Sequence, residues 1–184
     1  MRALAVIALT TFLAASPAWA IDILGGPALY DPVISGDLDK VERLLGTGYY
    51  PDGLLDETGK TALMLAASAG NEDMVALLLR YKAKPDQRDQ VGNTALSYAA
   101  SRGQVAAAEV LLKNRASTDA ENRQGMTPLM IAAQQGQSDL VRLLLSNGAD
   151  ATRYDFTGRT ALMWAETNRR SATAATLKKA GVKE

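Results

Sequence analysis

Apolar residues occur along the chain in two kinds of block that alternate. The first kind is short and rich in alanine, as in residues 61–67, and the second is rich in leucine, as in residues 74–79. In the second kind, Val75, Leu78 and Leu79 have the i, i+3, i+4 spacing of one helix face. We therefore expect pairs of short helices, in which a small-residue helix is followed by a helix with a leucine stripe.

Both blocks recur every 33 residues. Residues 61–66 read TALMLA, and the corresponding segments are 94–99 (TALSYA), 127–132 (TPLMIA) and 160–165 (TALMWA). A glycine stands two residues before each of these threonines, and an Asp or Asn stands three residues before each glycine. A period of this length indicates an array of repeats, in which stacked units bury the apolar stripe that one unit cannot bury alone.

The residues around the first block predict how each unit is built. Asp or Asn followed three residues later by Gly is typical of a type I turn. The threonine after the turn is a preferred N-cap, and Pro128 occupies the favoured first helical position. Gly70, Gly103 and Gly136 stand nine residues after the first three threonines. We expect each of these glycines to end its helix in the left-handed conformation.

The 33-residue unit resembles the ankyrin repeat, whose signature is T-P-L-H-x-A. The likeness covers residues 28–181 and implies an all-α ankyrin-repeat solenoid of about five helix-turn-helix units with connecting β-turn loops. Three complete units span residues 57–89, 90–122 and 123–155. They lie between a degenerate N-terminal unit at 28–56 and a C-terminal capping unit at 156–184. Residues of the N-terminal unit match those of the next unit at a spacing of 34 residues instead of 33. These segments are called units 1 to 5 in chain order.

The fourth signature position departs from the family pattern. The family commonly has a histidine there, which hydrogen-bonds between neighbouring units, whereas this chain has Met64, Ser97, Met130 and Met163. Because methionine fills irregular gaps in a core, we expect the contact between units to be more apolar than usual. Methionine sulfur also binds Cu(I), so methionine-based metal handling stays open as an alternative.

The resemblance also implies a binding surface, because ankyrin-repeat proteins usually bind partners with the turn tips and the exposed side of the first helix. We call this surface the concave face. Its candidate residues, carried over position by position, are Lys60, Arg102, Arg123, Met126, Gln134, Gln135, Phe156 and Arg159. With four cations and two apolar anchors, Met126 and Phe156, the face suits an acidic or mixed protein surface. Tyr98 and Trp164, at the fifth signature position, are expected in the core.

The first 20 residues have the three-part layout of a secretory signal peptide. Arg2 supplies positive charge, residues 3–15 are uncharged, and Ala18 and Ala20 place small side chains before a cleavage point at Ile21. The uncharged run of 13 residues is shorter than the roughly 20 that a membrane span needs. We expect a cleaved leader at 1–20, a short lead at 21–27 and no membrane span after cleavage. The periplasm is the expected destination, with secretion as the second choice.

Composition limits the chemistry that the chain can perform. It has no Cys and no His, which excludes thiolate and imidazole catalysis, disulfides and histidine-ligated zinc. Its 20 Lys+Arg are balanced by 20 Asp+Glu, which argues against a nucleic-acid binder. Phosphate-loop and nucleophile-elbow motifs are absent from the sequence. We expect no enzyme, no cofactor and no metal site, and a carboxylate-dependent enzyme is the least favoured alternative.

These observations favour a non-catalytic module that binds another protein along its concave face. Small exported bacterial ankyrin-repeat proteins include some that resemble accessory factors of periplasmic stress-defence enzymes such as catalases. Others resemble immunity proteins, which neutralise a toxin delivered into the periplasm. Both roles rest on likeness to the family rather than on a particular residue. The accessory role is the expectation and the immunity role is the alternative.

Overall fold

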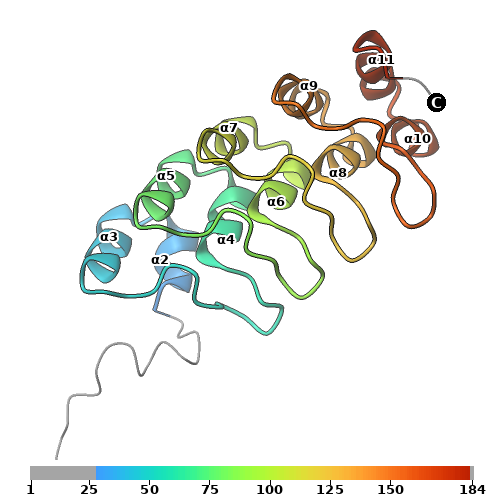
Figure 1. Ribbon diagram of the computed structural model, residues 1–184. Helices are drawn as coiled ribbons and strands as arrows, with labels where there is room; N and C mark the ends of the chain where they lie inside the picture. Colours follow the sequence, from blue (N-terminus) through green and yellow to red (C-terminus); the bar gives the residue numbers. More distant parts are fainter. Residues whose placement is uncertain (1–27, 183–184) are drawn as a thin grey trace, which may run out of the picture.

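The structure is a computed structural model that describes residues 28–182, so the expected leader and lead lie outside the described residues. Within this range the chain forms ten helices in five consecutive pairs (Figure 1). The pairs are α2 (Tyr30–Ser35) with α3 (Leu38–Gly46), α4 (Ala62–Ala69) with α5 (Glu72–Arg80), α6 (Ala95–Arg102) with α7 (Val105–Lys113), α8 (Pro128–Gln135) with α9 (Ser138–Ser146), and α10 (Ala161–Thr167) with α11 (Ser171–Lys179).

The pairs stack side by side into a solenoid with two rows of helices. The first helices of the units pack on one another in an inner row, in which α6 lies between α4 and α8, and α8 lies between α6 and α10. The second helices form an outer row, in which α7 contacts α5 and α9. Long loops project from the same side of the inner row (Figure 1). The predicted all-α stack of about five helix-turn-helix units is therefore confirmed.

The helix ends are built as the repeat pattern predicts. At four of the five inner helices the cap is a threonine whose side chain accepts a hydrogen bond from the backbone N–H three residues later; these caps are Thr61, Thr94, Thr127 and Thr160. Gly70, Gly103 and Gly136 end α4, α6 and α8 with φ between 72° and 84°. In unit 5 the corresponding residue is Arg169, which also has a positive φ of 57°. The left-handed turn is therefore kept where glycine is lost.

The core runs through the whole stack because the inner helices carry small residues. Alanines at the same position of four units, Ala66, Ala99, Ala132 and Ala165, are fully buried. Small side chains let the inner helices approach closely, and the leucine stripes of the outer helices cover them. Met64 and Met130 are buried in this core, as expected from the signature position that they occupy. The described residues contain no helix long and apolar enough to cross a membrane.

The C-terminal end of the stack is made polar by two substitutions in the repeat pattern. Ala67, Ala100 and Ala133 are fully buried at a position where unit 5 has Glu166. Leu79, Leu112 and Leu145 occupy a second position of the repeat, and unit 5 has Lys178 at that position. The two new side chains pair with each other, with Lys178 Nζ 2.6 Å from Glu166 Oε1. An ion pair thus lies where the inner units have apolar side chains, as a terminal repeat requires.

Candidate concave binding face

The turn tips are shaped by the Asp or Asn that begins each turn. Asp89 Oδ1 accepts hydrogen bonds from the backbone N–H groups of Val91 (2.9 Å) and Asn93 (2.8 Å). The same two bonds occur at Asp56, Asn122 and Asp155. These side chains satisfy backbone donors that the turn would otherwise leave unpaired. The tips therefore have a defined shape before any partner binds.

Neighbouring tips are joined by a ladder of backbone hydrogen bonds. The N–H groups of Gln90, Arg123 and Phe156 each donate to a carbonyl of the preceding tip, at 2.9–3.0 Å. The accepting carbonyls belong to Thr58, Val91 and Gln124. Together the loops form one edge of the molecule, alongside the inner helices (Figure 1). A partner that binds here therefore meets a preorganised surface, which lowers the entropic cost of binding.

In two of the turns the second carboxylate oxygen of the Asp accepts a hydrogen bond from an aromatic side chain nine residues later. In unit 3 the Tyr98 hydroxyl donates to Asp89 Oδ2 at 2.7 Å, and in unit 5 the Trp164 indole N–H donates to Asp155 Oδ2 at 2.8 Å. Units 2 and 4 have no such donor, because Leu65 and Ile131 occupy the aromatic position.

Where the aromatic donor is missing, the turn residue is satisfied in another way. Asp56 Oδ2 lies 3.8 Å from Lys60 Nζ in an ion pair. Asn122 replaces the carboxylate altogether, and its side-chain N–H donates to Asn93 Oδ1 at 3.0 Å. The residue nine positions later thus decides how the turn residue is satisfied. An aromatic donor serves Asp89 and Asp155, and where it is missing a lysine ion pair or an asparagine takes its place.

The protonation of these groups follows from the same contacts. Burial raises the pKa of Asp155, but hydrogen bonds from Arg159, Thr157 and Trp164 outweigh it, and the pKa falls below its ordinary value. Asp56 behaves in the same way. Burial, followed by the hydrogen bond to Asp89, raises the pKa of Tyr98 far above its ordinary value. Asp56 and Asp155 are therefore ionised acceptors held in the turns, with no raised pKa of the kind that a general acid needs.

A cationic side chain lies over each of the two aromatic rings, Tyr98 and Trp164, that donate to the turn aspartates. Lys60 Nζ is 5.8 Å from the centre of the Tyr98 ring, which belongs to the next unit, and the Arg159 guanidinium carbon is 4.7 Å from that of Trp164. Such contacts contribute about 0.5–1 kcal/mol at exposed sites. Tyr98 and Trp164 pack against the core as expected, but they remain half-buried and face the turns, where they orient both the acid and the cation.

Five of the eight candidate residues are exposed on the concave face. Arg102 ends α6, Gln135 ends α8, Arg123 and Phe156 are at turn tips, and Arg159 follows a tip. Phe156 is 74% exposed, so it is the most exposed large apolar side chain among the described residues. Gln134 and Lys60 are half-buried, and Lys60 is engaged with Asp56 and Tyr98.

The structure corrects the assignment of Met126 as an apolar anchor. Met126 is only 4% exposed and belongs to the continuous core. It occupies the position that is Lys60, Asn93 and Arg159 in the other units, where the side chains are polar and more exposed. A long apolar side chain at this position packs inward, because burial removes its apolar surface from water. Met126 is therefore part of the core in this structure and not an exposed anchor of the face.

Sequence reasoning missed one apolar residue of the face and one structural ladder. Ile34 in α2 corresponds to Ser68 at the 34-residue offset of unit 1 and is 56% exposed. Before the turns, a second set of hydrogen bonds joins consecutive loops, in which a carboxylate accepts from the backbone N–H of the next loop: Asp52 from Lys84, Asp86 from Ser117 and Asp119 from Asp150. The spacing of these three aspartates, 34 and then 33 residues, is the signal that would have revealed this ladder.

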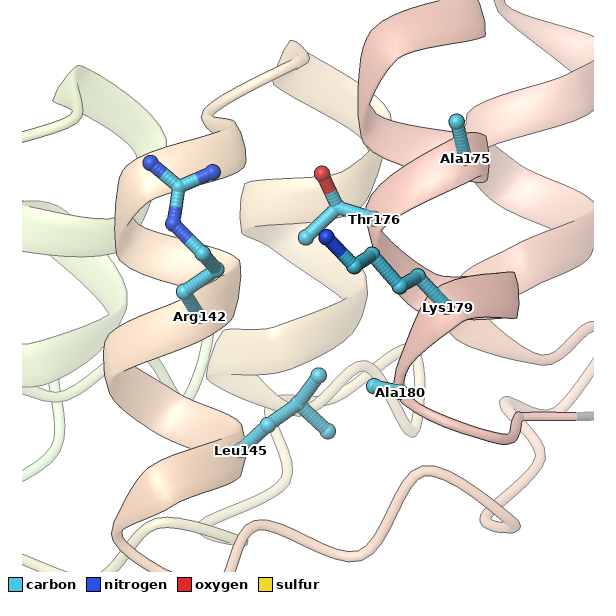
Figure 2. A pocket seen from close by; sticks show the side chains of 6 residues that line it. All are labelled: Arg142, Leu145, Ala175, Thr176, Lys179 and Ala180. Atoms are coloured by element: carbon cyan, nitrogen blue, oxygen red, sulfur yellow. The ribbon is translucent and has the colours of Figure 1, made fainter.

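A groove on the outer row differs in character from the concave face. It has a volume of about 520 Å³ and lies between α9 and α11, lined by Arg142, Leu145, Ala175, Thr176, Lys179 and Ala180 (Figure 2). Arg142 is paired with Asp139 on its own helix, and no carboxylate lines the groove. Within the described part of the chain, no group of three or more acidic side chains could hold a metal ion. The groove therefore offers no acid of the kind that carboxylate catalysis uses.

Comparison with known proteins gives one match to a family. A family model for ankyrin repeats, containing three copies of the repeat, matches residues 29–122 and again residues 111–183. The two matches together span nearly all of the described chain. A search of curated proteins finds none that matches the chain.

Proposed function

Because the chain belongs to the ankyrin-repeat family, we propose that it is a non-catalytic module that binds a partner protein along its concave face. The ladder of backbone hydrogen bonds that joins the four turn tips is the observation that carries the proposal. It holds the exposed side chains of units 2 to 5 in one rigid surface. A rigid surface of exposed arginine, glutamine and aromatic side chains suits recognition of a folded or extended protein.

Site-specific photo-crosslinking tests which side of the stack binds. We place p-benzoylphenylalanine at Ala69 and Gln135, which are exposed on inner helices, and at Ala76 and Ala106, which are exposed on outer helices. Ala69 and Ala76 form a matched pair, because both are exposed alanines of unit 2. We expect a specific cross-linked protein from the inner positions alone. Cross-links from the outer positions alone would refute the concave-face proposal.

We also propose that the protein acts in the periplasm after removal of residues 1–20. The charge, length and small-residue pattern of these residues support export. N-terminal sequencing of the protein purified from cell envelopes tests this step. We expect the mature chain to begin at Ile21, and a chain that keeps Met1 and remains inside the cell would show the proposal to be wrong.

The identity of the cross-linked protein decides the biological role. A resident envelope enzyme that protects against oxidative stress would make the chain an accessory factor, which is the role that we propose. A toxin from a competing cell would make it an immunity protein. The two roles use the same face, so the distinction depends on the partner and not on the geometry of this chain.

A further inference from the structure

The arginines of the concave face in units 3 to 5 form no ion pair with any described residue. Arg102, Arg123 and Arg159 are all exposed, and none lies within ion-pair distance of a carboxylate. Arg159 stacks on Trp164 instead. These three guanidinium groups therefore have their charge available to a partner.

The outer row differs in part. Three of its cations are paired with an acid on the same or a neighbouring helix, namely Arg80 with Glu42, Lys113 with Glu109 and Arg142 with Asp139, whereas Lys40, Arg43 and Lys179 form no ion pair with a described residue. The acids of the concave face in units 3 to 5 are already engaged. Asp89 and Asp155 are buried in their turns, and Glu166 pairs with Lys178. The chain has equal numbers of cationic and acidic residues, but this part of its surface has an excess of exposed positive charge.

Apolar side chains lie among these cations. Val91 and Phe156 are 54% and 74% exposed at the turn tips, and the half-buried Tyr98 and Trp164 extend from the inner helices to the turn residues Asp89 and Asp155. A surface with both features matches a partner in which acidic residues alternate with apolar ones. Lysine would attract such a partner by charge alone. All three unpaired cations are arginines, whose planar donors can hold a carboxylate in two hydrogen bonds.

We infer that the partner presents an acidic segment with interspersed apolar side chains to units 3 to 5. Its carboxylates pair with Arg102, Arg123 and Arg159, and its apolar side chains pack on Phe156 and Val91. The inference rests on the proposed function and adds the chemistry of the partner to it. Complementary charge of this kind speeds association and excludes basic partners.

Two labelled peptides test the inference directly. In one, Asp and Glu alternate with Phe and Leu, and in the other Lys replaces every acid. We measure their binding to the purified protein by fluorescence anisotropy. We expect the acidic peptide to bind at least about tenfold more tightly than the basic one, with an affinity that falls as salt is added. Equal binding of the two peptides would overturn the inference.

A matched pair of triple variants places the binding on the face. The test variant is R102Q/R123Q/R159Q, and the control is K40Q/K84Q/K179Q, which removes the same charge from exposed lysines outside the concave face. We expect the test variant to lose about tenfold or more in affinity for the acidic peptide, while the control stays within about twofold of the wild type. Circular dichroism confirms that both variants fold. Equal losses would mean that net charge alone governs binding, and would overturn the inference.

Failure of the inference is distinguishable from failure of the proposed function. If the inner positions cross-link a protein partner but the acidic peptide does not bind, the acidic chemistry is wrong and the concave-face module stands. If only the outer positions cross-link, both are wrong.

Discussion

The close approach of neighbouring turn tips makes a quantitative prediction about two glycines. Gly92 and Gly148 have the same positive φ of 84°. A Cβ atom on Gly92 would lie 2.9 Å from the backbone nitrogen of Arg123 in the next unit, whereas a Cβ on Gly148 would meet nothing within 4 Å. Substituting each by alanine therefore imposes the same backbone strain, but only G92A forces two units apart.

The expected magnitudes follow from these two terms. The left-handed conformation costs a non-glycine residue about 1–2 kcal/mol, and the stiffer unfolded chain of the alanine variant returns about 0.4–1 kcal/mol. We expect G148A to lower the free energy of unfolding by about 1 kcal/mol. Overpacking adds about 1–3 kcal/mol at Gly92, and the adjacent hydrogen bond from Arg123 N–H to the Val91 carbonyl is worth about 1 kcal/mol. Together with the net strain of about 1 kcal/mol, these contributions predict that G92A costs about 3–5 kcal/mol.

Urea unfolding followed by far-UV circular dichroism measures both values. Gly158 provides a second control, because it occupies the same turn position as Gly92, and a Cβ atom there would meet nothing within 4 Å among the described residues. G158A should resemble G148A. If G92A and G148A cost the same, the tips do not approach as closely as the structure has them, and the face is not preorganised in the way that we propose.

Four further predictions concern the turns, the helix ends and the cap. Tyr98→Phe leaves Asp89 Oδ2 without its donor and should cost about 1–3 kcal/mol in urea unfolding; adding Asp89→Asn should recover part of this loss, and a purely additive double variant would refute the coupling. Arg115 has φ 65° at the position of Gly148, so R115G should stabilise by about 0.5–1 kcal/mol, whereas N114G, where φ is −97°, should destabilise. Because the pKa of Asp56 is lowered in the folded state, its contribution to stability is present above the ordinary pKa of an aspartate and is lost as pH falls through the lower folded value. The D56N variant, which copies Asn122, should therefore lose less stability than the wild type when both are titrated with acid. An identical dependence of stability on pH would contradict the assignment. The double variant Glu166→Ala/Lys178→Leu places the apolar residues of the inner units at the C-terminal end of the stack. Sedimentation velocity should then show self-association of the variant that the wild type lacks at equal concentration. An unchanged sedimentation coefficient would contradict the capping role.

Local signals in the sequence predicted the repeat and its helix ends. Threonine caps, turn-forming Asp and Asn, and the glycines at the ends of α4, α6 and α8 act through partners only a few residues away. Their outcome therefore depends little on the rest of the fold. Most of the exposed candidate residues, such as Arg102, Arg123 and Phe156, were also predictable, because polar tips and helix ends of a solenoid face solvent.

Tertiary structure decided the features that depend on contacts between units. Met126 turns into the core although its counterparts Lys60 and Arg159 lie at the surface, and Tyr98 reaches Asp89 to satisfy a buried oxygen. The ion pair of Arg80 with Glu42 likewise forms because α5 and α3 become neighbours. The 33-residue period sets which positions are equivalent, but the inward or outward direction of each side chain depends on the volume and hydrogen-bonding partners that the adjacent unit supplies.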